Sequence, residues 1–467
     1  MKEIITIPLL SSHLFKEITV IVVSGLKTFI ATLCKSSCCL IQHFHILPYL
    51  LAGLIVCISC KPDKACSQNT FLDDDCCPFA DTGAPLIPAP DIKLVNIFIE
   101  TSGSMSGYMP DGEITAFKRT IRDIISRINE RFTNINSYSI YNSKTSFKRL
   151  DITTLENNIH KGKFSWSGST DLPVMLDSIK VYNDDSVVNI LITDLIFSPE
   201  NKHEGNIAYT TTDIRKTYQA FSNKFSVSIF CLSSEFKSKN IYSAQSPYYV
   251  ILQGSPRNVQ YVGSLIRKAL EELKETYHEV NYGFTYNKPY YSTLSLTGTT
   301  GDFVAGRCTS YNNAFISLQD IDLKEHGTDY LQFWIGLDLK EYPSYVSDST
   351  YMKDNINVTL KGGNAKILSV KDKLPVEING EDDKTIASNC NQFIQIGISD
   401  LKNKSSILTI SLKYSKPAWI DHLSESANEN NREKTYGLGK INEGLEQAYS
   451  SKEAYFFKDL PISLIKK

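Results

Sequence analysis

The chain has 467 residues with 49 basic and 51 acidic side chains, which gives a formal net charge of −2. Hydrophobic residues make up 42% of it and aromatic residues 11%, so most of the chain can bury an apolar core, and its length suggests about two or three domains. The balanced charge argues against a nucleic-acid-binding protein that depends on a general basic field.

Residues 1–60 are predicted to be a signal or anchor segment. No acidic residue lies between Glu17 and Asp63, and the apolar run Ile46–Val56 has the length of a signal-peptide core. This run ends in Cys57-Ile-Ser-Cys60, which resembles the bacterial lipobox, although Cys57 stands where Leu is usual. The resemblance implies that Cys60 is lipidated and that the protein is lipid-anchored in the bacterial cell envelope. It does not distinguish the inner from the outer membrane. The alternative is an uncleaved transmembrane anchor over residues 40–59.

Eight of the eleven cysteines lie in the first 77 residues. A secreted fold held together by disulfides would spread its cysteines along the chain, so the rest of the protein is not expected to depend on disulfides. Residues 61–91 are polar and then rich in proline, which predicts a semi-extended stalk.

Strand and helix signals alternate from residue 92 to residue 280. Apolar runs predict buried strands, and helical spacing of apolar residues from Ile114 to Phe132 and from Val262 to Leu273 predicts two amphipathic helices. The predicted strands are Leu94–Ile99, Val187–Ile192, Phe225–Leu232 and Tyr248–Leu252, with a further strand or hairpin in 136–150. The pattern predicts an α/β domain with an open, mostly parallel sheet and helices on both faces.

Residues 285–467 are predicted to form a mostly antiparallel, sandwich-like β domain with a helix near its end. Polar, turn-rich stretches separate its apolar runs. The predicted strands are Tyr330–Leu337, Ile356–Leu360, Gln392–Ile398 and Ile407–Tyr414. The helix, from Leu438 to Ala448, could pack on either domain.

Three loops of the α/β domain are rich in oxygen donors. Glu100, Ser102 and Ser104 follow the first strand, Thr170 precedes a helix, and Asp194 follows the second buried strand. Because ligands of open α/β sheets bind at the carboxyl ends of the strands, we expect these side chains to meet there. Carboxylates and hydroxyls suit Mg²⁺, Mn²⁺ or Ca²⁺.

The three loops resemble the metal-ion-dependent adhesion site of von Willebrand factor type A (vWA) domains. That site reads Asp-x-Ser-x-Ser in its first loop, and its second and third loops supply Thr and Asp. Ser102, Ser104, Thr170 and Asp194 match in order, over a resemblance that covers about residues 92–275. Glu100 departs from the pattern, because the family has Asp at this position.

The resemblance implies one divalent ion, Mg²⁺ or in its place Mn²⁺ or Ca²⁺, held by Ser102, Ser104, Thr170, Asp194 and Glu100. It also implies a partner protein that donates a carboxylate to the ion. The protein is then a metal-dependent adhesion or assembly module, attached to the membrane through its lipid and not binding nucleic acid. A second departure from the family lies beside the site, where Leu195 replaces the Gly of many members.

The same residues could instead have purely structural roles. The serines and Thr170 could cap the helices that follow them, and Asp171 is predicted to be such a cap rather than a ligand. Tyr108, Met109 and Trp166 are candidates for a rim that contacts the partner.

Two other functions remain open. The protein could be a structural or assembly component whose metal site is degenerate, which the departure at Glu100 allows. A serine hydrolase is less favoured, because Gly103-Ser-Met-Ser-Gly107 places Met105 where G-x-S-x-G needs the nucleophile. A serine-reactive fluorophosphonate probe would detect it. We do not predict an enzyme.

Overall fold

The structure of the protein is a computed structural model. It describes residues 90–467 except 142–145, 199–205, 240, 295–300, 309–313, 324–330, 379, 429 and 451–454. The predicted signal or anchor segment, Cys60 and nearly all of the predicted stalk lie outside the described residues. Within the described part, no helix is both long and apolar enough to span a membrane.

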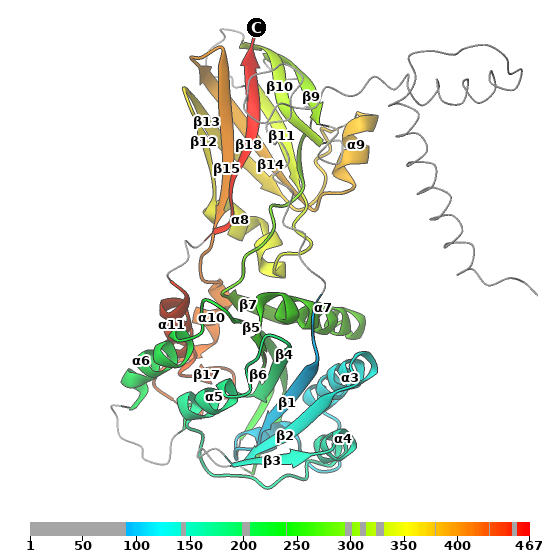
Figure 1. Cartoon of the computed structure of the whole chain (residues 1–467), viewed down its shortest axis with the longest axis vertical. Coiled ribbons are helices and arrows are strands. Elements are labelled where there is room, and N and C mark those ends of the chain that lie inside the picture. The colour runs from blue at the N-terminus through cyan, green and yellow to red at the C-terminus, as the bar shows by residue number, and fades with distance from the viewer. Residues whose placement is uncertain are drawn as a thin grey trace, which may run out of the picture. The chain divides into compact units, whose positions relative to one another are not determined.

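The first part of the chain forms a seven-stranded mixed sheet. Its strands are β1 (Leu94–Glu100), β2 (Ile135–Tyr141), β3 (Ser146–Leu150), β4 (Val187–Thr193), β5 (Ser226–Lys237), β6 (Tyr242–Gly254) and β7 (Tyr277–Tyr282). Their order across the sheet is β3-β2-β1-β4-β6-β5-β7 (Figure 1). β1 pairs in parallel with β2 and β4, and the other pairings are antiparallel.

The predicted α/β class is confirmed, but the prediction of a mostly parallel sheet was wrong. β5 and β6 are joined by a short connection, which is closed by a hydrogen bond from Ser238 N to Ile241 O (2.9 Å). Such a connection reverses the chain, because a parallel pair needs a crossover of about a dozen residues or more. β6 then lies against β4, so this hairpin makes the half of the sheet beyond β4 antiparallel.

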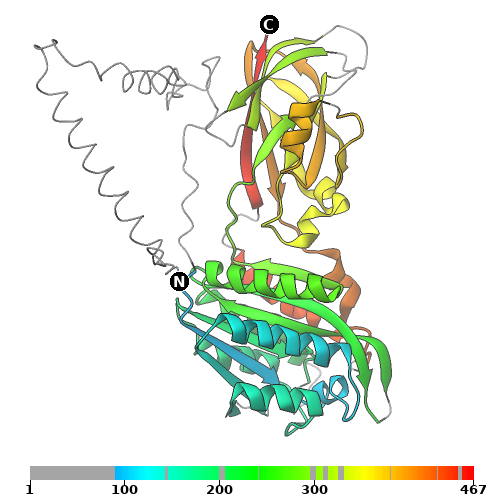
Figure 2. The ribbon, with the colours of Figure 1, turned by 90° about the vertical axis from the view of Figure 1, so that its right-hand side faces the viewer.

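Helices cover both faces of the sheet (Figure 2). One face carries α3 (Ala116–Arg131), α4 (Ile152–Lys161) and α7 (Pro256–Leu273). The other face carries α5 (Leu172–Lys180), α6 (Asn206–Gln219), α10 (Ala418–Leu423) and α11 (Leu438–Tyr449). Ile114, expected on the first helix, precedes α3 and is 75% exposed.

The sequence of β1 explains why both faces are covered. Val95, Ile97 and Ile99 alternate into the core on the α3 side, whereas Phe98 packs on the α5 side. Asn96 is buried as well, and its side-chain amide donates to Asn189 Oδ1 on β4 (2.8 Å). This bond satisfies a polar group that would otherwise be costly inside the sheet.

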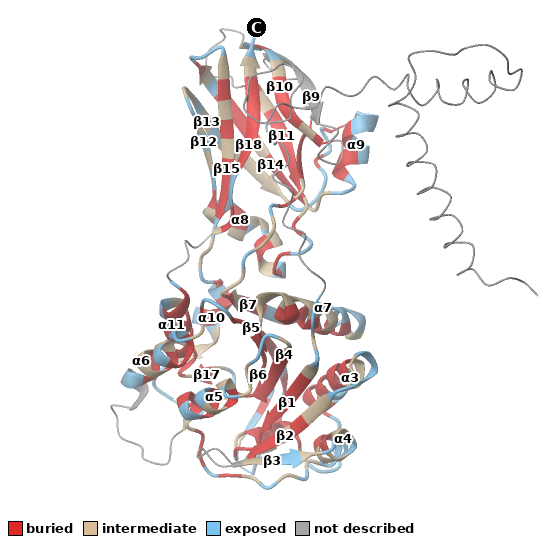
Figure 3. Cartoon of the chain, viewed as in Figure 1, coloured by how far each residue is buried: buried red, intermediate tan, exposed pale blue. Residues whose placement is uncertain are grey.

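The remaining strands form two further sheets. Their strands are β8 (Tyr291–Leu294), β9 (Gly301–Cys308), β10 (Ala314–Leu323), β11 (Leu331–Leu337), β12 (Ile356–Leu360), β13 (Gly363–Lys371), β14 (Gln392–Leu401), β15 (Ser405–Lys413) and β18 (Tyr455–Lys466). The sheet orders are β12-β15-β18-β10-β9 and β13-β14-β11-β8. Apolar residues of both sheets share one core, and burial follows their inner faces (Figure 3).

All pairings in these two sheets are antiparallel except that of β10 with β18, so the predicted antiparallel β domain is confirmed at this level. Two short helices, α8 (Ser349–Asn355) and α9 (Glu381–Ala387), lie among the strands. The final strand β18 was not predicted from the sequence. It occupies the centre of the five-stranded sheet.

The segment between β15 and β18 packs on the α/β sheet. Trp419, Ile420, Leu438 and Leu445 belong to the same apolar cluster as residues of α5 and β5, and α11 lies along α6. Between α10 and α11 the chain forms a loop over residues 424–437, closed by the parallel pair β16 (Ser424–Glu425) and β17 (Thr435–Tyr436). The chain therefore returns to the α/β domain before it completes the β domain.

Candidate functional site

The structure brings the three predicted loops together at the ends of β1 and β4. Ser167 N donates to Thr101 O (2.8 Å), which ties the second loop to the first. Thr170 N donates to Ser198 O (2.7 Å) and Ser198 N to Thr170 O (3.0 Å), which ties the second loop to the third. Backbone hydrogen bonds thus fix the relative positions of the loops.

Glu100, the last residue of β1, lies beneath these loops and is only 2% exposed. Thr170 Oγ1 donates to Glu100 Oε1 (2.5 Å), and the hydroxyl of Thr193 donates to the other oxygen. Sequence reasoning missed Thr193. Its only sequence signal is its place at the end of β4, directly before Asp194.

The two serines do not cap the following helix. Ser104 is the N-cap residue of the 3₁₀ helix Met105–Tyr108, but its side chain makes no capping hydrogen bond. Instead, the hydroxyls of Ser102 and Ser104 lie 3.0 Å apart and share a hydrogen bond. Asp171, in contrast, caps α5 by accepting from Val174 N (3.3 Å), as predicted.

Asp194 is fully buried, and its carboxylate is only half satisfied. Oδ1 accepts from Ile196 N (3.2 Å), whereas Oδ2 is buried and finds no hydrogen-bond partner among the described residues. Leu195 follows with φ at +54°, a left-handed conformation that residues other than glycine rarely adopt. The strained backbone therefore sits directly beside the unsatisfied carboxylate.

The two carboxyl groups are held where neither ionises easily. Burial and then the nearby charge of Asp194 raise the pKa of Glu100 to about 7, although hydrogen bonds from Thr170, Thr193 and Ser102 oppose this shift. Burial also raises the pKa of Asp194 above its usual range, although the nearby Ser104 hydroxyl and the backbone N–H of Ile196 oppose that shift. A cation near both groups would stabilise their ionised forms.

A hollow of about 210 Å³ opens at the three loops. Ser102, Ser104 and Thr170 line one side of it, and Asn430 and Arg432 from the loop over 424–437 line another. No sequence motif pointed to the last two, which lie far along the chain, between β15 and β18.

The donors present fit a divalent cation. The hydroxyl proton of Thr170 points to Glu100, so the lone pairs of its oxygen stay free for a cation. The hydrogen bond between Ser102 and Ser104 likewise leaves acceptor capacity, and Asp194 Oδ2 is an anionic oxygen that lacks a donor. The described residues hold no cluster of three or more His, Cys, Asp or Glu side chains, so hydroxyls would have to complete the ligand set.

Two of the three predicted rim residues lie in the core instead. Tyr108 is 0% and Met109 2% exposed, and the Tyr108 hydroxyl donates to Pro247 O (2.6 Å). Tyrosine at this position is thus a buried anchor that holds the end of the first loop. Trp166 is half-buried, with Phe164 packed edge-on against it at 5.5 Å.

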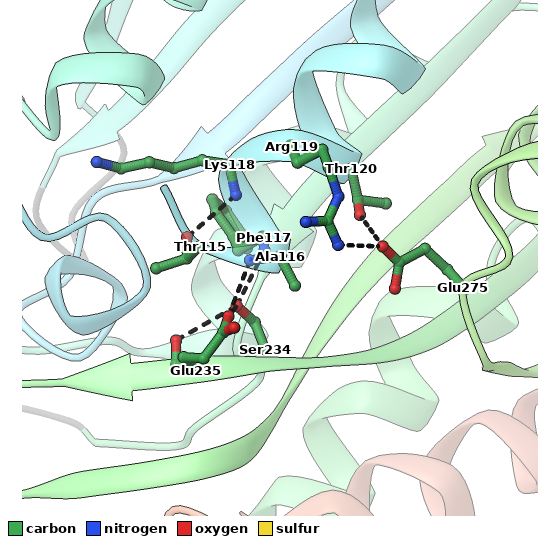
Figure 4. Close-up of polar contacts among 9 residues, drawn as sticks. All are labelled: Thr115, Ala116, Phe117, Lys118, Arg119, Thr120, Ser234, Glu235 and Glu275. Atoms are coloured by element: carbon green, nitrogen blue, oxygen red, sulfur yellow. Dashed lines mark hydrogen bonds and ion pairs between the residues drawn. The ribbon is translucent and has the colours of Figure 1, made fainter. Parts of the chain in front are cut away.

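Hydrogen bonds to two residues of β5 anchor α3, the helix after the first loop (Figure 4). Ala116 N donates to Glu235 Oε2 (2.9 Å). Phe117 N donates to Ser234 Oγ (2.9 Å), and the Thr115 hydroxyl accepts from the next turn. These bonds satisfy the free N–H groups of the first turn of α3 and so fix where the loop must end.

Comparison with known proteins adds no relative: the chain matches no family model, no curated protein and no solved structure.

Proposed function

We propose that the protein is an envelope-anchored, divalent-metal-dependent protein-binding module that uses a vWA-like site. Ser102, Ser104, Thr170 and Asp194 would hold the ion. Glu100 would contribute its negative charge from beneath the loops and would orient the Thr170 hydroxyl. The ion would supply a Lewis acid that accepts a carboxylate from the partner. Anchoring through a lipid on Cys60 is part of the same proposal and rests on the sequence.

The observation that supports this function best is the buried, unpartnered Oδ2 of Asp194 in the same group of loops as Ser102, Ser104 and Thr170, whose hydroxyl oxygens keep free lone pairs. A buried carboxylate oxygen without a donor is costly unless something positive approaches it. A cation at this place would satisfy Asp194 and would stabilise the ionised form of Glu100.

Calorimetric titration of the purified full chain with Mg²⁺ and Mn²⁺ tests the proposal. We expect a binding heat that disappears in Thr170→Ala/Asp194→Ala. Asp171→Asn is the matched control, since Asp171 is a neighbouring carboxylate that caps α5, and this variant should keep the heat. No heat in the wild-type chain would contradict the proposal.

One observation keeps a second candidate in view, a structural or assembly component with a degenerate site. Both oxygens of Glu100 already accept hydrogen bonds from threonines, so Glu100 is satisfied without any ion. Under this alternative, neither Mg²⁺ nor Mn²⁺ binds, and Thr170→Ala/Asp194→Ala leaves the assembly of the protein with its partners intact.

A further inference from the structure

Arg432 reaches the candidate site from a loop that is itself well fixed. Glu425 accepts from Ser426 N (2.8 Å), Ala427 N (2.9 Å) and Asn431 Nδ2 (3.0 Å), which closes the loop on itself. At the other end, a hydrogen bond of 2.7 Å joins the buried hydroxyls of Thr435 and Tyr249 on β6. The loop is therefore attached to the sheet that carries the site.

The guanidinium of Arg432 is held in place by an aromatic ring. Its Cζ lies 4.8 Å from the centre of the Phe236 ring, a stacking contact typical of arginine. Phe236 is buried and packs against Gly107 in the first loop, where a side chain at Gly107 would meet the ring. The charge is thus positioned relative to the predicted ligands Ser102 and Ser104.

Arg432 has donors without acceptors. Its Nε and Nη1 are buried and have no hydrogen-bond partner among the described residues. Buried N–H groups of a charged side chain are rarely left in this state, and the hollow that Arg432 lines is shared with Ser104 and Thr170. The site therefore has unmet donors on Arg432 and an unmet acceptor on Asp194.

Charge indicates what would meet both needs. The charge of Arg432 favours the ionised form of Asp194, but no hydrogen bond joins Asp194 Oδ2 to Nε or Nη1 of Arg432. A divalent cation that balances Glu100 and Asp194 would therefore leave Arg432 without a counter-charge. One carboxylate would restore the balance. The two oxygens of a carboxylate also fit the planar guanidinium of an arginine. The guanidinium can bind both oxygens, or it can bind one that also coordinates a metal.

We propose that Arg432 is a specificity-determining residue that binds the carboxylate of the partner while the same carboxylate coordinates the cation. This inference rests on the proposed function, and it adds that the ligand is selected by two positive groups rather than by the ion alone. A neutral hydroxyl or amide ligand could coordinate the ion but would leave Arg432 unpaired.

The test measures cation and carboxylate binding separately on the full chain in detergent. Mn²⁺ affinity is measured by calorimetry. Binding of glutarate to the Mn²⁺-loaded chain is then measured from the relaxation of the glutarate protons, which bound Mn²⁺ accelerates, with the neutral diamide of glutarate as the second probe. We expect glutarate to bind and the diamide to bind at least about tenfold more weakly.

Arg432→Gln should weaken glutarate by roughly ten- to hundredfold, the range for a lost charge-assisted hydrogen bond, and should leave Mn²⁺ affinity unchanged or higher. Arg432→Lys keeps the charge but not the fork, so its glutarate affinity should lie between the two. Arg131→Gln is the matched control, because Arg131 also stacks on an aromatic ring, at 5.6 Å from the centre of Tyr261, but does not line the hollow.

The outcomes separate the two proposals. Absence of Mn²⁺ binding to the wild-type chain overturns the proposed function and this inference with it. Mn²⁺ binding with equal glutarate affinity in wild type and Arg432→Gln overturns only the role of Arg432, as does a failure of glutarate to bind. If Arg432→Gln lowers the melting temperature, Arg432→Lys decides, and unchanged glutarate affinity in that variant overturns the inference.

Discussion

Leu195 places a fully buried side chain on a backbone conformation that suits glycine. Its φ of +54° lies in the left-handed region, and its N–H donates to Thr193 Oγ1 (2.9 Å). The side chain contributes to the core beneath the third loop, while the backbone conformation costs about 1–2 kcal/mol for a residue with a Cβ. Burial and the hydrogen bonds around the loop keep the residue in this conformation.

We predict an inverted order of stability for substitutions at Leu195. Both Leu195→Ala and Leu195→Gly should destabilise the chain by about 2–5 kcal/mol through lost burial. Glycine is ordinarily worse than alanine by about 0.5–1 kcal/mol, but here it should be equal or better because it relieves the left-handed strain. Urea denaturation measures this, with Leu191 in the extended strand β4 as the control at which alanine should be the better residue.

Glu100 should make the metal-free chain less stable as the pH rises. Its pKa is about 7 in the folded chain against 4.5 for an ordinary glutamate, so the folded state holds the proton more tightly, and stability falls as the pH rises through 7. Between pH 6 and pH 8 the loss is about 1 kcal/mol, or roughly 2–4 °C in melting temperature. Glu100→Gln should lack this part of the pH slope when melting is measured in EDTA, and equal slopes in both proteins would contradict it.

At the scale of elements, the sequence predicted those whose signal is local. Buried strands such as β1 and β4 read directly as apolar runs, and α3 and α7 as helical spacing. The strand order could not be read, because it depends on which hairpin inserts beside β4. The same limit applies to the site: Ser102 and Asp194 lie in local motifs, whereas Arg432 reaches the site only through the packing of distant segments.

The packing of α11 on α6 is close enough to be tested with one methyl group. A Cβ on Gly444 would lie 2.7 Å from Thr211 O and 2.8 Å from Ile214 Cβ, closer than real contacts allow. Gly444→Ala should therefore destabilise the chain by about 1–3 kcal/mol despite the better helix propensity of alanine. Gly439→Ala, in the same helix, meets only the Ser424 side chain, whose hydroxyl lies 3.3 Å away, and should be neutral or stabilising. Similar losses in both variants under urea would contradict the close packing.

At the scale of the whole molecule, two separate segments of the chain build the α/β domain. After β15 the chain returns to lay α10 and α11 over one face of the seven-stranded sheet, and only then forms β18. Residues of this second segment, which carries α10 and α11, complete the apolar core on that face. The loop between the two helices brings Arg432 to the hollow. Completion of the site is thereby linked to folding of the whole region, because neither part of the chain holds all of its residues.

A fragment that ends before the β domain should therefore fold poorly. Residues 90–285 contain every strand of the seven-stranded sheet but leave uncovered the face that α10 and α11 pack against, including Leu172, Ile214 and Val227. We expect this fragment to bind a dye specific for exposed apolar surface and to be cut rapidly by protease, whereas residues 90–467 should resist both. Adding the missing residues as a separate chain should restore protection at α6 and β7 first, because α11 packs there. A 90–285 fragment that melts cooperatively at the temperature of the longer chain would contradict this prediction, because α10 and α11 would then add nothing to the stability of the α/β domain.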